Sequence, residues 1–166
     1  DDCQKLVKDF FGMNNKNQKY NLAAINSINW VRIIGQIVYY FWSYFRVEKN
    51  FNPINYVIPT GNFGNVYAGF VSKCMGLPIR KLIVSSNKND ILTRFFSSGE
   101  MKKEKVRESL SPSMDIQVSS NFERLIFYYT KNSSYTNGLY KTLHETGKFK
   151  INKELHLKIL KDFDGG

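Results

Sequence analysis

The sequence predicts an α/β domain in which a parallel sheet is flanked by helices. Short apolar runs at 56–58 and 81–85 are bounded by turn signals, as is typical of buried parallel strands. A helical pattern follows each run, at 66–75 and 90–96. Because parallel neighbours need a crossover connection, this strand–helix alternation favours a parallel sheet.

The remaining elements are predicted from helix caps, apolar spacing and breakers. Further helices are expected at 2–11, from Ser27 or Asn29 to about 47, and at 121–129, 139–146 and 153–162. A short strand is expected at 20–25, a polar loop at 12–19 and a charged, flexible segment at 97–112.

Length and composition favour one globular domain. The 166 residues are 42% hydrophobic and 15% aromatic, which allows a real core and excludes a disordered chain. No internal boundary is visible, so residues 1–166 are expected to form a single segment. The chain starts at Asp1 without Met and stops in a turn-like Asp-Gly-Gly sequence, so we expect it to be truncated at both ends.

The net charge of +10 raises the question of an anionic partner. The lysines are scattered singly, the densest group is 102–105, and no arginine-rich stripe or nucleic-acid signature occurs. AT-rich coding bias explains the same excess of Lys, Asn, Ile, Phe and Tyr. The prediction is therefore no nucleic-acid partner.

The cysteines, the histidines and the hydropathy of the sequence bear on metal binding, membrane insertion and cellular compartment. Cys3 and Cys74 form no C-x-x-C pair, and His144 and His156 lack neighbouring ligands, so no metal site is expected. Two cysteines in this pattern suit a reducing compartment. The apolar stretch 33–45 is too short to span a bilayer. We therefore expect a cytoplasmic protein with no membrane contact.

A glycine-containing loop follows the first predicted parallel strand. Gly61, Asn62, Phe63, Gly64 and Asn65 connect this strand to a helix. Backbone N–H groups converge at such a junction, and the helix N-terminus adds partial positive charge, so the loop is a candidate phosphate site. Its glycine spacing matches neither an NTPase P-loop nor a dinucleotide fingerprint. From these residues alone, an ordinary strand-to-helix turn explains the pattern equally well.

A second candidate anion site consists of Asn26, Ser27 and Arg32. The first two residues stand where a strand gives way to a helix, and Arg32 follows within the first turns. The planar guanidinium suits two phosphate oxygens at once. A capped helix with a surface arginine is the alternative.

Five motifs in one order resemble threonine synthases, which are pyridoxal 5'-phosphate (PLP) enzymes of the fold-type-II, tryptophan-synthase-β-like group. The resemblance is dense over residues 1–130 and weaker beyond. The motifs are NSINWVR at 26–32, PTGNFGNV at 59–66, LPIRKLI at 77–83, NDILTRFF at 89–96 and SPSMDIQVSSNFER at 111–124. The glycine loop is similar to the loop that holds the cofactor phosphate in that family.

The resemblance implies a lyase that converts O-phospho-L-homoserine and water to L-threonine and phosphate in threonine biosynthesis. It implies PLP binding by residues 61–65 and substrate-phosphate binding by Asn26, Ser27 and Arg32. It also places the Schiff-base lysine before residue 1 and the partner of the cofactor ring nitrogen after residue 166. No residue of this chain is therefore expected to be catalytic, and the isolated chain is expected to be inactive.

Two other functions stay open at this stage. One is a non-catalytic threonine-synthase-like protein, and the other is a basic module that binds anions or nucleic acid. A dehydratase of the same fold group is disfavoured, because its substrates bring no phosphate to the Asn26, Ser27 and Arg32 cluster.

Overall fold

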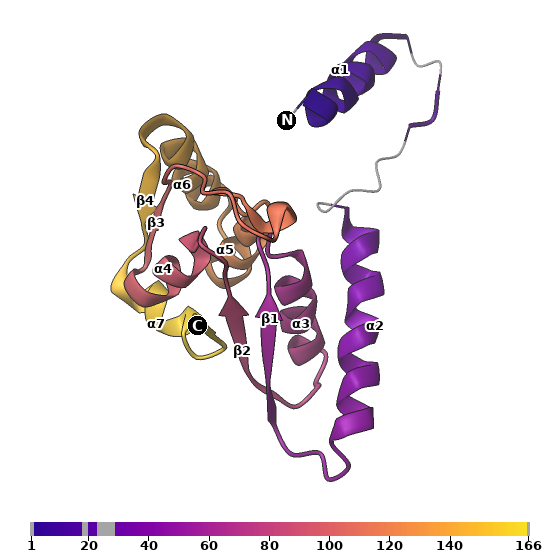
Figure 1. Cartoon of the computed structure of the whole chain (residues 1–166), viewed down its shortest axis with the longest axis vertical. Coiled ribbons are helices and arrows are strands. Elements are labelled where there is room, and N and C mark those ends of the chain that lie inside the picture. Colours follow the sequence, from indigo (N-terminus) through magenta and orange to yellow (C-terminus); the bar gives the residue numbers. More distant parts are fainter. Residues whose placement is uncertain (1, 18–19, 23–28, 166) are drawn as a thin grey trace.

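A computed structural model describes residues 2–17, 20–22 and 29–165. Its helices and strands alternate along most of the chain (Figure 1). The helices are α1 (Asp2–Asn17), α2 (Trp30–Val47), α3 (Gly64–Cys74), α4 (Ile91–Ser98), α5 (Phe122–Thr130), α6 (Ser133–Thr146), α7 (Lys153–Ile159) and the 3-10 turn η1 (Pro112–Met114). The strands are β1 (Ile54–Pro59), β2 (Ile79–Ser85), β3 (Glu100–Lys102), β4 (Lys148–Lys150) and β5 (Phe163–Gly165).

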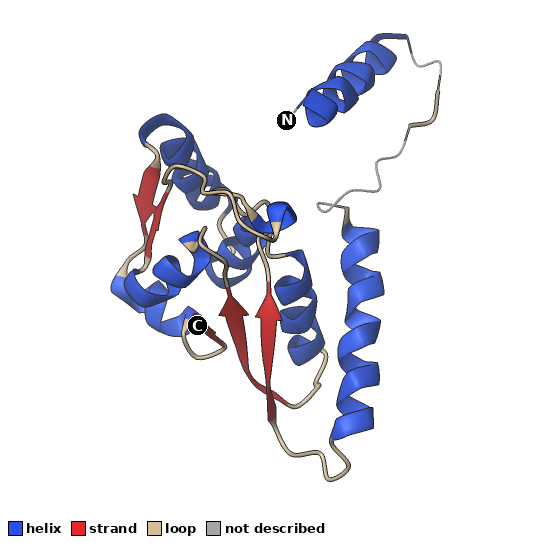
Figure 2. Cartoon of the chain, viewed as in Figure 1, coloured by secondary structure: helices blue, strands red, loops and turns tan. Residues whose placement is uncertain are grey.

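The central sheet is parallel and has the order β1-β2-β5 (Figure 2). Leu82 in the middle strand pairs with Tyr56 on one side and Phe163 on the other. A separate antiparallel pair joins β3 to β4. Helices flank the sheet, so the predicted α/β class with a parallel sheet is confirmed.

The core is rich in aromatic rings that join the loop after β1 to distant elements. Phe63 is fully buried and its ring centroid lies 5.0 Å from Phe122, 5.8 Å from Phe163 and 6.5 Å from Phe96. These rings come from the first loop, α5, β5 and α4. Burial of such large apolar rings stabilises the fold and fixes the loop against it.

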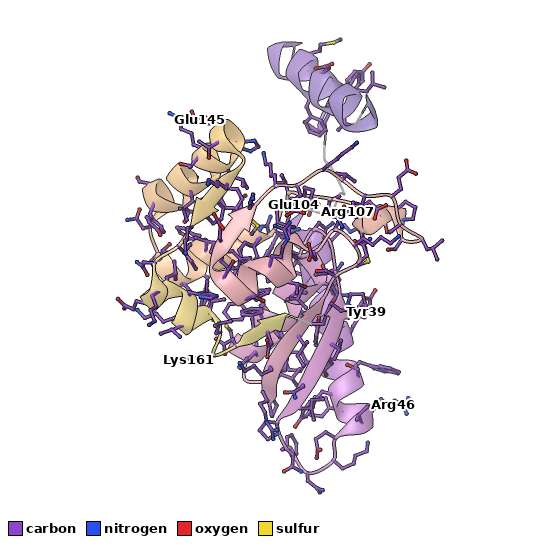
Figure 3. The ribbon with its side chains drawn as sticks, turned by 60° about the vertical axis from the view of Figure 1, so that its left-hand side comes forward. Tyr39, Arg46, Glu104, Arg107, Glu145 and Lys161 are labelled. Atoms are coloured by element: carbon purple, nitrogen blue, oxygen red, sulfur yellow. The ribbon has the colours of Figure 1, made fainter. Side chains whose placement is uncertain are left out.

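Helices α2 and α3 pack side by side next to β1 (Figure 1). Gly69 permits this contact, because a Cβ atom there would lie 2.7 Å from the Tyr40 ring and 2.9 Å from Leu82. Tyr40 and Tyr44 are buried on this face of α2. Tyr39, on the exposed flank of the same helix, is 66% exposed (Figure 3). The aromatic residues of α2 thus supply core side chains on one face of the helix only.

Several element boundaries differ from the predictions. α1 continues to Asn17, through most of the predicted loop, and α6 begins six residues earlier than predicted, at Ser133. Tyr20–Leu22 are not in a strand, and the rest of the predicted strand 20–25 lies outside the described residues. β3, β4 and β5 were not predicted, because strands of three residues are too short to show an alternating or continuous apolar pattern.

The charged segment 97–112, which was predicted to be flexible, contains a strand and makes local hydrogen bonds. It contains β3, and the carboxylate of Asp115 then accepts hydrogen bonds from Ser109, Asn87 and Asn89 at 2.6–2.9 Å. Glu104 and Arg107 lie close together in this segment (Figure 3), with 3.9 Å between their charged groups. Side-chain oxygen atoms therefore accept hydrogen bonds here in place of the backbone carbonyls of a regular sheet. Among the described residues, no helix is long and apolar enough to cross a membrane.

Candidate functional site

A pocket of about 310 Å³ opens at the carboxyl end of β1. Its walls come from α2, from the end of β1 with the loop that follows and the start of α3, and from η1. The lining residues are Arg32, Ile33, Gln36, Pro59, Thr60, Gly61, Asn62, Gly64, Asn65, Ser113 and Met114. Ligands of open parallel sheets bind outside the carboxyl ends of the strands, so the place is typical of a binding site.

The loop after β1 takes its shape from two local hydrogen bonds and one buried ring. The Phe63 N–H donates to Thr60 Oγ1 at 3.2 Å, and the Gly64 N–H donates to Asn62 Oδ1 at 3.1 Å. Phe63 itself has a φ of 66°, a left-handed conformation that costs energy for a residue with a Cβ. The aromatic contacts of its ring offset this cost and hold the turn in place.

The loop carbonyls are held from behind by the segment that leads into α5. Ser119 Oγ donates to Gly61 O at 2.8 Å, while the backbone N–H and Nδ2 of Asn121 both donate to Asn62 O at 3.1 Å. Across a trans peptide, a carbonyl and the next N–H point in opposite directions. The bond to Gly61 O therefore turns the Asn62 N–H away from Ser119.

Four backbone donors of the loop are left without an acceptor. Within the described part of the chain, the N–H groups of Gly61, Asn62, Asn65 and Val66 make no hydrogen bond. The last two belong to the first turn of α3, where the helix adds partial positive charge. A Cβ at Gly61 would lie 3.1 Å from Ile116 and Met114, so glycine also permits the close approach of η1.

Two side-chain amides add further donors. The Oδ1 atom of Asn62 is engaged by Gly64, and Tyr40 Oη lies 2.7 Å from Asn65 Oδ1 and 2.9 Å from Asn65 O. Burial raises the pKa of Tyr40, so its hydroxyl remains a protonated donor. Because both amide oxygens are occupied by the chain, both Nδ2 groups are left to face a ligand.

Arg32 reaches the same pocket from the first turn of α2. Asn29 caps this helix by accepting from the Val31 N–H at 2.8 Å. Asn26 and Ser27 lie outside the described residues. The sequence predicts one anion site at the loop and a second at Arg32, and the structure places Arg32 and the loop on the walls of one pocket.

The pocket therefore contains a cation and several unengaged donors, and none of its lining residues is acidic. Anions with several oxygen atoms can satisfy such groups. A phosphate monoester fits this donor set, since its oxygens accept charge-assisted hydrogen bonds and its charge is favoured at a helix N-terminus.

Sequence reasoning missed the residues that support the loop. Tyr40 was not connected with Asn65, and Ser119 and Asn121 were not connected with the loop 58 and 59 residues earlier. No sequence pattern reveals such distant contacts. Gln36 was also missed, although it is a polar residue inside an apolar helix, four residues after Arg32. That spacing places both on one helix face.

Comparisons with known proteins identify similar chains. No family model matches the sequence. The chain is 43% identical to threonine synthase of Saccharomyces cerevisiae and 42% identical to that of Pseudomonas aeruginosa, covering 98% and 99% of this chain but 34% and 35% of the relatives. It is 38% identical to human "Threonine synthase-like 1" over 98% of the chain. This chain thus spans about a third of the length of the threonine synthases it matches.

Solved structures give the same answer for the fold. PLP-bound threonine synthase from Brucella melitensis superposes with a TM-score of 0.90 and 41% identity, over 99% of this chain and 36% of that one. Threonine synthase from yeast superposes with a TM-score of 0.85, also at 41% identity, over 99% of this chain and 34% of that one.

Proposed function

We propose, from the premise that this chain belongs to the threonine synthase family, that it forms the phosphate-binding part of a PLP-dependent lyase. The proposed reaction converts O-phospho-L-homoserine and water to L-threonine and phosphate. Since the chain spans about a third of its relatives, residues outside it are needed to complete the active site.

The donor set of the loop is the observation that carries the proposal. Within the described part of the chain, the backbone N–H groups of Gly61, Asn62 and Asn65 make no hydrogen bond, and these residues line a pocket that has no acidic lining residue. The side-chain amides of Asn62 and Asn65 add further donors there. These residues suit the phosphate of PLP, the cofactor that is bound in the similar threonine synthase from Brucella melitensis. When bound, PLP supplies an electron sink for negative charge that develops on the substrate.

The residues of this chain then have three tasks. The loop amides and the two asparagines bind the cofactor phosphate and set its position. Ser119 and Asn121 hold the loop so that these donors stay oriented without reorganising when the ligand arrives. Arg32, with Asn26 and Ser27, is proposed to bind the phosphate of the substrate and to stabilise its negative charge as it leaves.

An activity assay tests this proposal. The full-length protein that contains this chain should release phosphate from O-phospho-L-homoserine and form an equal amount of threonine, only with PLP present. The 166-residue chain by itself should release none. The proposal is wrong if the PLP-loaded full-length protein forms no threonine. Release by the isolated chain would instead contradict the expectation that the catalytic lysine lies outside it.

The proposal also covers the cellular compartment of the protein and the molecules that it binds. We infer a cytoplasmic enzyme that acts on a small molecule and has no nucleic-acid partner. The free thiol of Cys74, exposed at the surface, is compatible with a reducing compartment. DNA or RNA binding that weakens steeply with salt, in the absence of PLP affinity, would favour the basic-module alternative.

A further inference from the structure

We infer that Gln36 is an additional anion-binding residue of the pocket, and that its amide donates a hydrogen bond to the phosphoryl group that Arg32 contacts. This inference rests on the proposed function and deepens it. It starts from an unsatisfied buried group: Gln36 Oε1 is shielded from solvent and has no hydrogen-bond partner in the described part of the chain. Buried polar atoms without partners are rare and costly, so such an atom on a pocket wall calls for an explanation.

The position of Gln36 supplies that explanation. It lines the same pocket as Arg32 and the loop residues Gly61, Asn62 and Asn65. Arg32 lies four residues earlier on α2, so the two side chains project from one face of the helix.

The chemistry of the amide suits an anion. Neither end of the amide is hydrogen-bonded within the described part of the chain, so a half-turn about the last side-chain torsion exchanges oxygen and NH₂ at little cost. Because only the oxygen is shielded from solvent, the NH₂ group can face a phosphate in the pocket and donate to it. A neutral residue is required, because a glutamate four residues from Arg32 would pair with it and cancel its charge.

The phosphoryl group has two possible sources, the cofactor and the substrate, because Arg32 and the loop share the pocket. The shared chemistry is a phosphate monoester. Measurements on the full-length protein separate the two sources. If Gln36→Met weakens PLP binding, the partner is the cofactor. If it raises KM for O-phospho-L-homoserine and leaves PLP affinity unchanged, the partner is the substrate.

The direct test uses inorganic phosphate and calorimetry, so that it does not depend on turnover. Gln36→Met removes the donor at similar volume and should weaken phosphate binding about 10-fold, as for loss of one charge-assisted hydrogen bond. Gln36→Glu should weaken it by about 100-fold or more, because it adds repulsion. Val47→Glu, at the far end of α2 and 76% exposed, adds the same charge away from the pocket and should leave the affinity unchanged.

The possible outcomes separate this inference from the proposed function. If Arg32→Met weakens phosphate binding and both Gln36 variants bind like the unaltered protein, the role of Gln36 is refuted while the pocket stands. If Gln36→Glu and Val47→Glu weaken binding equally, the effect is one of net charge and the inference also fails. If the unaltered protein binds neither phosphate nor PLP, both the inference and the proposed function are overturned.

Discussion

The hydroxyl of Tyr40, in the middle of α2, lies 2.7 Å from the side-chain oxygen of Asn65, in the first turn of α3. This hydrogen bond crosses between two helices and sets the direction of the Asn65 amide. It links the packing of α2 against α3 to the orientation of a proposed phosphate ligand. The geometry of the site therefore depends on how two helices pack as well as on the loop sequence.

Tyr40→Phe should weaken PLP binding. The change removes the hydroxyl that donates to Asn65 Oδ1 at 2.7 Å, so the Asn65 amide can rotate and its Nδ2 group is no longer fixed. Loss of a buried partner costs about 1–3 kcal/mol, so we expect PLP affinity to fall by a factor of about 5 to 150. Fluorescence titration with PLP measures it. Tyr39→Phe is the control. Because Tyr39 is 66% exposed, this variant should bind PLP with unchanged affinity.

Gly69→Ala should destabilise the fold. A Cβ atom at this position would lie 2.7 Å from the Tyr40 ring and 2.9 Å from Leu82, so the packing of these side chains must change. Overpacking of this kind costs about 1–3 kcal/mol, which urea unfolding at equilibrium can measure. Gly35→Ala provides a helical control, since a Cβ there meets nothing within 4 Å and alanine favours the helix. Equal stability of the two variants would contradict the packing described for α2 and α3.

Ser119→Ala should loosen the loop without removing any proposed ligand. Its hydroxyl donates to Gly61 O at 2.8 Å, and the bond fixes the direction of the Asn62 N–H. We expect PLP affinity to fall about 5- to 10-fold and the free energy of unfolding to fall by about 1 kcal/mol. The neighbouring Ser120→Ala is a matched control and should change neither quantity. A normal PLP affinity in Ser119→Ala would show that the loop keeps its shape unaided.

Asp115 should tie the segment 107–115 to the domain in a pH-dependent way. Hydrogen bonds from the Ser109 hydroxyl foremost, and also from the Ser109 N–H, Asn87 and Asn89, lower the pKa of Asp115. A lowered folded-state pKa means that the contribution is present above the unfolded value of about 3.9 and is lost as pH falls through the folded value. NMR titration of the Ser109 amide should show a midpoint below about pH 3.9, absent in Asp115→Asn. A midpoint above that value would contradict the proposed bonds.

Local patterns predicted the parts of the fold that rest on neighbours in sequence. The strand at 56–58, the helix from Asn29 to Val47 and the glycine loop were all predictable, because caps, apolar spacing and glycines act over a few residues. Two features were not predictable: the hydrogen bonds of Asp115 within the segment 107–115, and the support of the loop by Ser119 and Asn121. These contacts join residues far apart in sequence or replace regular structure. Phe63 was assigned to the loop correctly, but its left-handed backbone depends on packing against Phe122 and Phe163.

The central claim is that the donors around the loop bind a phosphate monoester, and one comparison tests it most directly. The full-length protein should be titrated with PLP and with 5-deoxypyridoxal, which keeps the ring and aldehyde but lacks the phosphate. Several charge-assisted hydrogen bonds to the phosphate should contribute about 1.5–3 kcal/mol each. We therefore expect PLP to bind at least about 100-fold more tightly than 5-deoxypyridoxal. In the double variant Asn62→Ala and Asn65→Ala, this ratio should shrink by at least about tenfold. Equal affinities for the two compounds would contradict the assignment of the loop as a phosphate site.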